Sequence, residues 1–335
     1  MTTNFVHYQS AHCENGVTSS LLRNGGLDIS EPMIFGIGSG LYFVFLPFLK
    51  VNHAPAVSFR PLSGLIFKRA VKRLGIKMKR RKFRSKQQAA GLLDINLKNN
   101  IPTGLQVGVY HLSYFPDEYR FHFNAHNLIV FGKTDTHYLI SDPVMQYTTE
   151  LTFEELEKVR FTKGVFAPKG QMYYPIHIPE KIDLKKAIIK GIKNTCRDML
   201  APPPIVGVNG MKYLSKKIRK WPHKIGEKKT NHYLAQIVRM QEEIGTGGGG
   251  FRFVYAAFLQ EAAGVLKRDE LNSFSAQMTE IGDQWRDFAV NASRVYKQRS
   301  QQKDVYNALA DQLYLLSELE KSFFKNLKKF IRTVA

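Results

Sequence analysis

The spacing of apolar residues changes once along this chain, and that change limits the folds open to it. Up to about residue 178, short β-rich runs alternate with short helical stretches, a pattern typical of an α+β domain. From about Pro179 onward the pattern is helical almost throughout. A chain of 335 residues is also long for a single hydrophobic core. We therefore predict an α+β domain over residues 1–178 and an α-helical domain over residues 179–335.

One uncharged segment, residues 32–49, needs to be distinguished from a membrane span. It is at the short limit of the roughly 20 apolar residues that a bilayer requires, and it contains three glycines and two prolines. We interpret it as buried core of the first domain. The N-terminal residues show no basic region followed by an apolar stretch, so we expect no secretory signal and a cytoplasmic location.

The chain has only two cysteines, Cys13 and Cys196. They are too few for a disulfide framework and form no CxxC pair, so we expect a reducing compartment and no metal site. Cys13 lies where a helix over residues 13–22 should begin, and a helix N-terminus stabilises a thiolate. Cys196 lies inside a helical stretch. Cys13 is therefore the candidate nucleophile, and the alternative is a buried cysteine without a chemical role.

A β-hairpin is predicted by two β-rich runs, residues 127–131 and 137–140. A loop centred on Thr134 would place His126 directly opposite Asp142, with Cβ atoms about 4.5–5.5 Å apart. A carboxylate in that position can orient an imidazole and stabilise its protonated form. The alternative is a surface hairpin that carries an unrelated histidine and aspartate.

Several stretches of the sequence carry a resemblance to a known family. The opening HCENGVTSSLLRNGGLDISEPMIFGIGSGLYF resembles the start of the butirosin biosynthesis protein H family. The stretches VGVYHLSYFP and AHNLIVFGKTDTHYLISDP resemble the second half of that family's catalytic domain. Downstream, IGTGGGGFRFVYAAFLQEAA and DQWRDFA resemble the helical domain that usually follows. The resemblance implies a papain-like catalytic domain related to double-glycine leader peptidases.

The same resemblance implies a function. The family's named member moves an acyl group from the phosphopantetheine thiol of an acyl carrier protein to an amine of an aminoglycoside. Carried over, Cys13 would be the nucleophile, His126 the base and Asp142 the orienting acid, with a small-molecule or lipid amine or hydroxyl as the acceptor. Papain relatives usually add an oxyanion-binding glutamine upstream; Gln9 is the nearest candidate, only four residues before Cys13. No bound cofactor is expected, because the substrate arrives on the carrier.

The net charge of +21 points to an anionic partner. Twelve cationic residues and no acidic residue lie between Arg60 and Lys86. Acyl carrier proteins are acidic, so we expect a carrier to dock on this basic surface. The candidate contacts are Arg80, Arg81 and Lys82 for the carrier and Arg252, after the glycine-rich residues 245–250, for phosphopantetheine. A structural ion pair is the alternative for Arg252.

Other partners and functions remain open from the sequence. No nucleic-acid-binding motif is present, but peripheral contact with the inner face of a membrane fits the charge. A cysteine peptidase or amidase would use the same three residues, because transfer and hydrolysis share one acyl-enzyme intermediate. The chain could also be a membrane- or carrier-binding module whose triad is vestigial.

Overall fold

A computed structural model describes residues 2–297 and 304–334. It divides the chain into two compact units, the first made of Met1–Ile34 and Phe67–Ile182 and the second of Phe35–Ile66 and Asp183–Ala335. The first unit is α+β and the second is mainly helical, so the predicted α+β domain followed by a helical domain is confirmed. The predicted boundary after residue 178 falls close to the division at Ile182.

The uncharged N-terminal segment is placed differently from the prediction. It is buried core, as expected, but from Phe35 onward it belongs to the second unit and not to the first. The reason is aromatic packing: Phe35 stacks on Phe251, with ring centroids 5.1 Å apart, and Phe43 packs against Trp285. Contacts between residues distant in the sequence decided this assignment, and the local sequence pattern does not reveal them.

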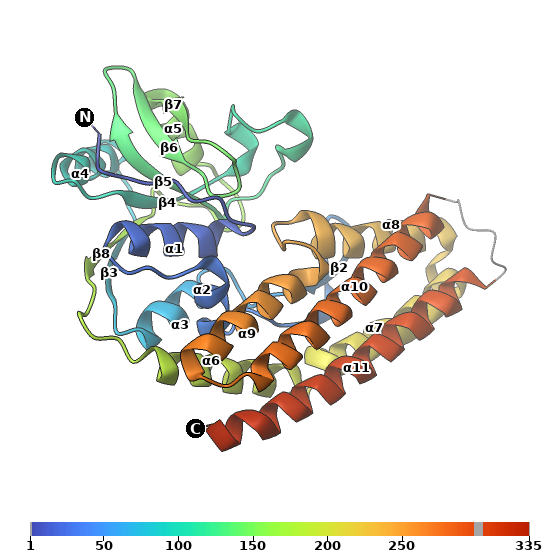
Figure 1. Cartoon of the computed structure of the whole chain (residues 1–335). Helices are drawn as coiled ribbons and strands as arrows, with labels where there is room; N and C mark the ends of the chain where they lie inside the picture. The colour runs from blue at the N-terminus through green and yellow to red at the C-terminus, as the bar shows by residue number, and fades with distance from the viewer. Residues whose placement is uncertain (1, 298–303, 335) are drawn as a thin grey trace. The chain divides into compact units, whose positions relative to one another are not determined.

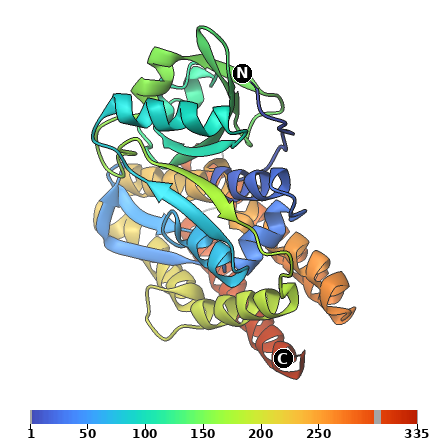
Figure 2. The same cartoon turned by 90° about the vertical axis from the view of Figure 1, so that its left-hand side faces the viewer.

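The first unit is built on a six-stranded antiparallel sheet with the strand order β3-β8-β4-β5-β6-β7. Figure 2 shows β3 and β8 side by side at one edge. The strands are β3 (Lys77–Arg81), β4 (Thr103–Val107), β5 (His126–Lys133), β6 (His137–Ser141), β7 (Thr149–Thr152) and β8 (Met172–His177).

Helices cover this sheet, and α1 (Cys13–Asn24) lies against β4 and β5 (Figure 1). The other helices of the unit are α4 (Lys86–Lys98) and α5 (Phe153–Arg160), with short 3₁₀ turns at Val109–His111 and Asp117–Tyr119. Both α1 and α4 contact β5, so the first five residues of that strand are buried on both faces. This burial explains why β5 reads as a nearly continuous apolar run and not as an alternating one.

Helix α1 begins and ends close to where its sequence predicts. Val17, Leu21 and Leu22 are buried on the predicted apolar face. The helix ends before Gly25, and Gly26 has a φ of +92°, a conformation that glycine adopts without steric cost. Cys13 is therefore the first residue of a 12-residue helix packed on the central strands.

The hairpin has a different register from the predicted one. Ile129 pairs with Ser141 and Lys133 with Tyr138, and a β-bulge shifts the register between Val130 and Gly132. The strands extend to Lys133 and from His137, so the loop is shorter than assumed and is centred after Thr134, while the extra β5 residue at the bulge changes the pairing by only one. As a result His126 and Asp142 are not directly opposed; Asp142 follows the end of β6.

The second unit is a helical domain with one small hairpin. Figure 1 shows α11 running along α7 and α10. Its helices are α6 (Leu184–Met199), α7 (Gly207–Ile225), α8 (Glu227–Val238), α9 (Arg252–Leu266), α10 (Glu270–Tyr296) and α11 (Val305–Val334), and its strands are β1 (Val44–Val51) and β2 (Ala54–Ser58). Helices α2 (Glu31–Ile37) and α3 (Leu65–Arg73) span two of the three points where the chain passes between units.

The glycine-rich residues 245–250 form a tight turn that leads into α9. Five of their glycines have positive φ, and a Cβ on Gly250 would lie 2.3 Å from the Phe59 ring. Close backbone packing therefore accounts for this run of glycines. Among the described residues, no helix has the length and apolar character needed to cross a membrane.

Candidate active site

Cys13, His126 and Asp142 meet in the first unit, on three different elements. Cys13 begins α1, His126 begins β5, and Asp142 follows β6. His126 Nε2 lies 2.6 Å from Asp142 Oδ2, and the imidazole also hydrogen bonds with the Cys13 side chain. Since Nε2 faces the carboxylate, Nδ1 is the nitrogen left for the thiol. The three residues form a nucleophile–base–acid arrangement.

Asp142 is held in place by two further hydrogen bonds. The Tyr114 hydroxyl donates to Oδ2 over 2.8 Å, and the Val144 backbone N–H donates to Oδ1 over 3.2 Å. Burial, followed by the charge of Asp142, raises the pKa of Tyr114 well above its ordinary value, so the phenol stays a donor. The carboxylate is fully buried with its hydrogen bonds satisfied, which fixes the orientation of the imidazole.

The surroundings of His126 favour its charged form. Burial alone would lower its pKa, but the charges of Asp142 and Cys13 and hydrogen bonds to both raise it well above the usual range. A protonated imidazole next to a cysteine stabilises the thiolate, as does the N-terminus of α1. Phe115 packs edge-on against the imidazole at a centroid distance of 5.5 Å. The site can therefore hold a thiolate–imidazolium pair at neutral pH.

Asn127 is a residue of the site that the sequence analysis missed. Its Nδ2 lies 3.9 Å from Cys13 Sγ and donates to the Ala125 carbonyl over 3.1 Å. The Tyr173 hydroxyl donates to Asn127 Oδ1 over 2.8 Å, which turns the amide N–H₂ group toward the sulfur. Adjacency to His126 is a signal that could have identified Asn127. Tyr114 and Tyr173 come from distant parts of the chain and have no such signal.

The segment that precedes Cys13 is anchored by Glu31, on the first turn of α2. Its two carboxylate oxygens accept hydrogen bonds from the backbone N–H groups of Ala11, at 2.8 Å, and His12, at 2.7 Å. Burial raises the pKa of Glu31 to about 7, although both hydrogen bonds act to lower it. A titratable carboxylate therefore holds the backbone next to the nucleophile.

Comparison with known families agrees with this geometry. Residues 12–143 match the family described as butirosin biosynthesis protein H, N-terminal. This match covers the part of the chain that contains Cys13, His126 and Asp142. Residues 154–327, more than half of the chain, match the family described as a domain of unknown function (DUF4872), and the chain belongs to that family. The match over residues 12–143, together with the arrangement of Cys13, His126 and Asp142, indicates a cysteine-type enzyme, a transferase or a peptidase.

One similar solved structure is a crystal structure described as a C39-like peptidase from Bacillus anthracis. It has 14% sequence identity and a TM-score of 0.36, over 52% of this chain and 97% of that chain. A search of curated proteins found no match.

Gln9 is the residue that the papain-like pattern suggested as an oxyanion donor. No described contact holds its side chain near the Cys13 thiol. Its side chain is exposed and makes no hydrogen bond within residues 2–297 and 304–334. The backbone N–H of its neighbour Ser10 donates to the Pro143 carbonyl over 2.6 Å. Gln9 therefore lies on the segment that passes Asp142, whereas Asn127 is the side-chain amide that contacts Cys13.

The basic residues expected to bind a carrier fall into two different environments. Arg80 and Arg81 are exposed on the edge strand β3, and Lys82 directly follows it. Arg80 donates to Gln171 Oε1 over 2.8 Å, and Arg81 lies over the Phe83 ring. Exposed cations also protect an edge strand from pairing with another chain, so their presence has a structural reason as well.

The prediction that Arg252 binds phosphopantetheine is wrong. Arg252 is fully buried in the second unit, where its Nε and Nη2 donate to Glu320 and its Nη1 donates to the Gly250 carbonyl. Its donors are occupied inside the core, so Arg252 forms the structural ion pair that was the alternative, and it is not placed to bind phosphopantetheine. Across the described ranges, no group of three or more His, Cys, Asp or Glu side chains could hold a metal ion.

Proposed function

We propose that this protein is a cysteine-dependent acyltransferase that takes its acyl group from a thioester on an acyl carrier protein. The observation that carries the proposal is the position of Cys13 at the N-terminus of α1, beside a His126–Asp142 pair joined over 2.6 Å. The family match supports transfer, since the resemblance of the sequence already implied it. The acceptor is an amine or a hydroxyl of a small molecule or lipid.

In the first step, the Cys13 thiolate attacks the thioester carbonyl carbon and a new carbon–Sγ bond forms. The bond from that carbon to the phosphopantetheine sulfur breaks. His126, protonated at the outset, gives its proton to the departing thiolate, so that neutral thiol leaves the site. Asp142 keeps the imidazole oriented throughout. The product is acyl-Cys13 with a neutral His126.

The negative charge that develops on the carbonyl oxygen requires hydrogen-bond donors. The Cys13 backbone N–H at the start of α1 is the first donor that we propose, because it lies next to the reacting sulfur at the positive end of the helix. The Asn127 amide is the second donor that we propose, since its N–H₂ group is directed at the sulfur and held by Tyr173. Asn127 thereby takes the role first expected of Gln9.

In the second step, the acceptor nitrogen or oxygen attacks the acyl carbon. His126 removes the acceptor's proton, the carbon–Sγ bond breaks, and the thiolate–imidazolium pair forms again. Hydrolysis differs only in that water is the attacking group. The choice between transfer and hydrolysis therefore depends on which nucleophile reaches acyl-Cys13.

An intact-mass experiment tests this chemistry. The protein is incubated with an acyl-pantetheine thioester and then with a panel of amines and alcohols. We expect the mass of one acyl group to appear on Cys13 and to disappear faster when the acceptor is added. Decay that is unchanged by every acceptor would favour the peptidase or amidase reading. No adduct with any thioester would favour a vestigial triad.

The carrier requirement is tested separately, with carrier-bound thioester compared to acyl-pantetheine. Charge reversal at Arg81 and Lys82 should slow only the carrier-bound reaction, and added salt should do the same. Arg80 is left intact because it holds Gln171. Charge reversal at Lys216 and Lys220, exposed on α7 in the second unit, is the matched control. Equal slowing by both pairs would argue against a docking site on β3.

A further inference from the structure

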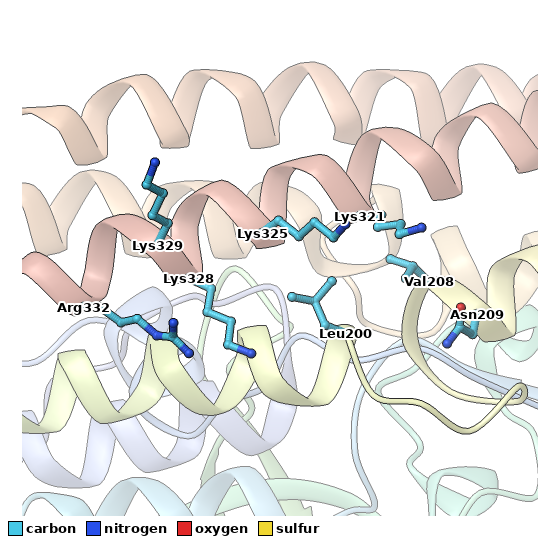
Figure 3. A pocket seen from close by; sticks show the side chains of 8 residues that line it. All are labelled: Leu200, Val208, Asn209, Lys321, Lys325, Lys328, Lys329 and Arg332. Carbon is cyan, nitrogen blue, oxygen red and sulfur yellow. The ribbon is translucent and has the colours of Figure 1, made fainter.

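A pocket in the second unit is lined mainly by cations. It has a volume of about 380 Å³ and lies among α11, the end of α6 and the start of α7. Figure 3 shows the eight lining residues, Leu200, Val208, Asn209, Lys321, Lys325, Lys328, Lys329 and Arg332. Five of the eight carry a positive charge and none carries a negative charge.

The five cations follow one side of α11. Successive members are one, three or four residues apart, so they share a helix face that extends about 16 Å along the axis. In Figure 3, Lys328 and Arg332 point from α11 toward α6, and Lys329 points the other way. The cations therefore line a groove along the helix and do not converge on a single point.

These cations form no ion pair with a carboxylate in the described parts of the chain, although the charge of Glu318 acts on Lys321 and Lys325. The neighbouring carboxylate, Glu318, is already paired with Lys212. Most of the positive charge of the groove is therefore left for a ligand or for solvent counterions.

Helix stability does not explain the arrangement. Cations are favoured in the last turn of a helix, which accounts for Arg332 but not for Lys321 or Lys325, two or more turns earlier. Like charges four residues apart destabilise a helix, and Lys325 has such a neighbour on each side, at Lys321 and Lys329. A bound anion would offset this repulsion.

We propose that this pocket binds a small molecule that carries two or more phosphate groups. One phosphate would neutralise at most two of the cations, whereas a group of linked or neighbouring phosphates matches both the charge and the elongated groove. Lysine ammonium groups suit phosphate oxygens because each offers three donors without a fixed plane. Leu200 and Val208 provide an apolar surface for the rest of the ligand. The volume is within the range of small-molecule sites.

Calorimetric titration of the full chain with inorganic tripolyphosphate tests the proposal, with orthophosphate and sulfate as weaker anions. The pocket variant combines Lys325→Gln, Lys328→Gln and Arg332→Gln. The matched variant combines Lys216→Gln, Lys220→Gln and Lys224→Gln, three exposed cations on α7. We expect saturable binding of tripolyphosphate that the pocket variant weakens at least about tenfold and the matched variant weakens less than about threefold. Melting temperatures without ligand identify any loss of folding.

Three outcomes would overturn the proposal. They are the absence of saturable tripolyphosphate binding, equal loss in both variants, and affinity for orthophosphate as high as for tripolyphosphate. Vesicles of phosphatidylcholine with and without phosphatidylglycerol separate a lipid headgroup from a free ligand. Binding to the anionic vesicles alone, lost in the pocket variant, would replace the small-molecule site with a membrane contact.

Discussion

The His126–Asp142 pair in the first unit and the Arg252–Glu320 pair in the second are both excluded from water, but they are completed in different ways. In the second unit, Glu320 accepts from Nε and Nη2 of Arg252 and from Nε1 of Trp285, which donates over 2.6 Å. The remaining Arg252 nitrogen is bonded to the Gly250 carbonyl. Partners within the core occupy each nitrogen of the guanidinium, so the pair has a structural role.

In the first unit, both carboxylate oxygens of Asp142 accept hydrogen bonds from within the site, whereas His126 interacts with Cys13 as well as with Asp142. One ring nitrogen faces the carboxylate and the other is left for a thiol that can change its bonding. The difference shows that burial and a short ion pair do not identify an active site by themselves. An active site is indicated when one member of the pair also contacts a nucleophile, as His126 contacts Cys13.

The largest expected effect separates the two cysteines. Cys13→Ala should abolish acyl-enzyme formation, because no other group can form the thioester bond. Cys196→Ala should leave the reaction rate within about twofold, since burial raises the pKa of the Cys196 thiol to about 12 and keeps it unreactive. The measurement is the intact mass after incubation with an acyl-pantetheine thioester. Retained labelling of Cys13→Ala would assign the nucleophile elsewhere.

Asp142→Asn tests the reactive pair. The substitution keeps the shape but favours the wrong tautomer of His126, so kcat/KM should fall roughly 10²- to 10⁴-fold. Asp94→Asn is the control, because Asp94 accepts from Lys133 and Tyr138 in the same unit outside the site. It should change stability more than turnover. Similar losses of activity in both variants would mean that Asp142 acts only through folding.

Glu320→Gln tests the saturated pair. It leaves the Arg252 charge buried and uncompensated, so the free energy of unfolding should fall by about 3–5 kcal/mol. Glu318→Gln, two residues earlier, removes the more exposed partner of Lys212 and should cost about 0–1 kcal/mol. Urea denaturation measures both. Equal effects would contradict the structural role that we assign to Arg252 and Glu320.

Glu31→Gln tests the carboxylate that holds the backbone of Ala11 and His12 next to the nucleophile. Burial raises the pKa of Glu31 from 4.5 to about 7, so between these pH values the folded chain binds a proton more tightly than the unfolded chain. Stability should therefore fall as the pH rises across that window, by up to about 3 kcal/mol. The variant should lack this part of the pH dependence in urea denaturation. An unchanged pH profile would show that Glu31 does not titrate there.

Asn127→Ala should have the smallest effect on the reaction. The variant keeps the Cys13, His126 and Asp142 side chains and loses one donor, so kcat/KM should fall about ten- to a hundredfold. Tyr173→Phe should lower it less, because it removes only the hydroxyl that orients the amide. Gln9→Ala is the matched control and should change kcat/KM less than about threefold. A larger loss in Gln9→Ala than in Asn127→Ala would restore Gln9 as the oxyanion donor.

The candidate site could be predicted where it depends on local sequence. Cys13 was predicted at a helix start because the apolar spacing and the following glycines define α1. His126 and Asp142 were predicted to face each other from the hairpin pattern. Their side chains are in contact although the register was wrong, because Asp142 follows the end of β6 and its carboxylate still reaches the imidazole across a two-residue offset.

The rest of the site depends on parts of the chain that the sequence does not connect. Tyr114 precedes β5 and Tyr173 lies on β8, and only the folded sheet brings them to Asp142 and Asn127. The same is true of Arg252: its position after the glycine-rich turn was visible, but its partner lies 68 residues away. Contacts between residues so far apart in the sequence depend on packing, and the spacing of apolar residues does not predict them.

By itself, then, the sequence determined the two-part organisation, the helix that begins at Cys13 and the positive charge, because each follows from residue type and short-range spacing. The tertiary structure alone decided that residues 35–66 join the helical unit, that Arg252 is buried, and that Asn127 contacts the thiol. It also placed Leu200, Val208 and Asn209 beside the cationic face of α11, which completes one pocket of the second unit. The physical reason is the same in each case: burial and hydrogen-bond partners depend on distances in space, and only packing brings residues far apart in the chain within a few ångströms.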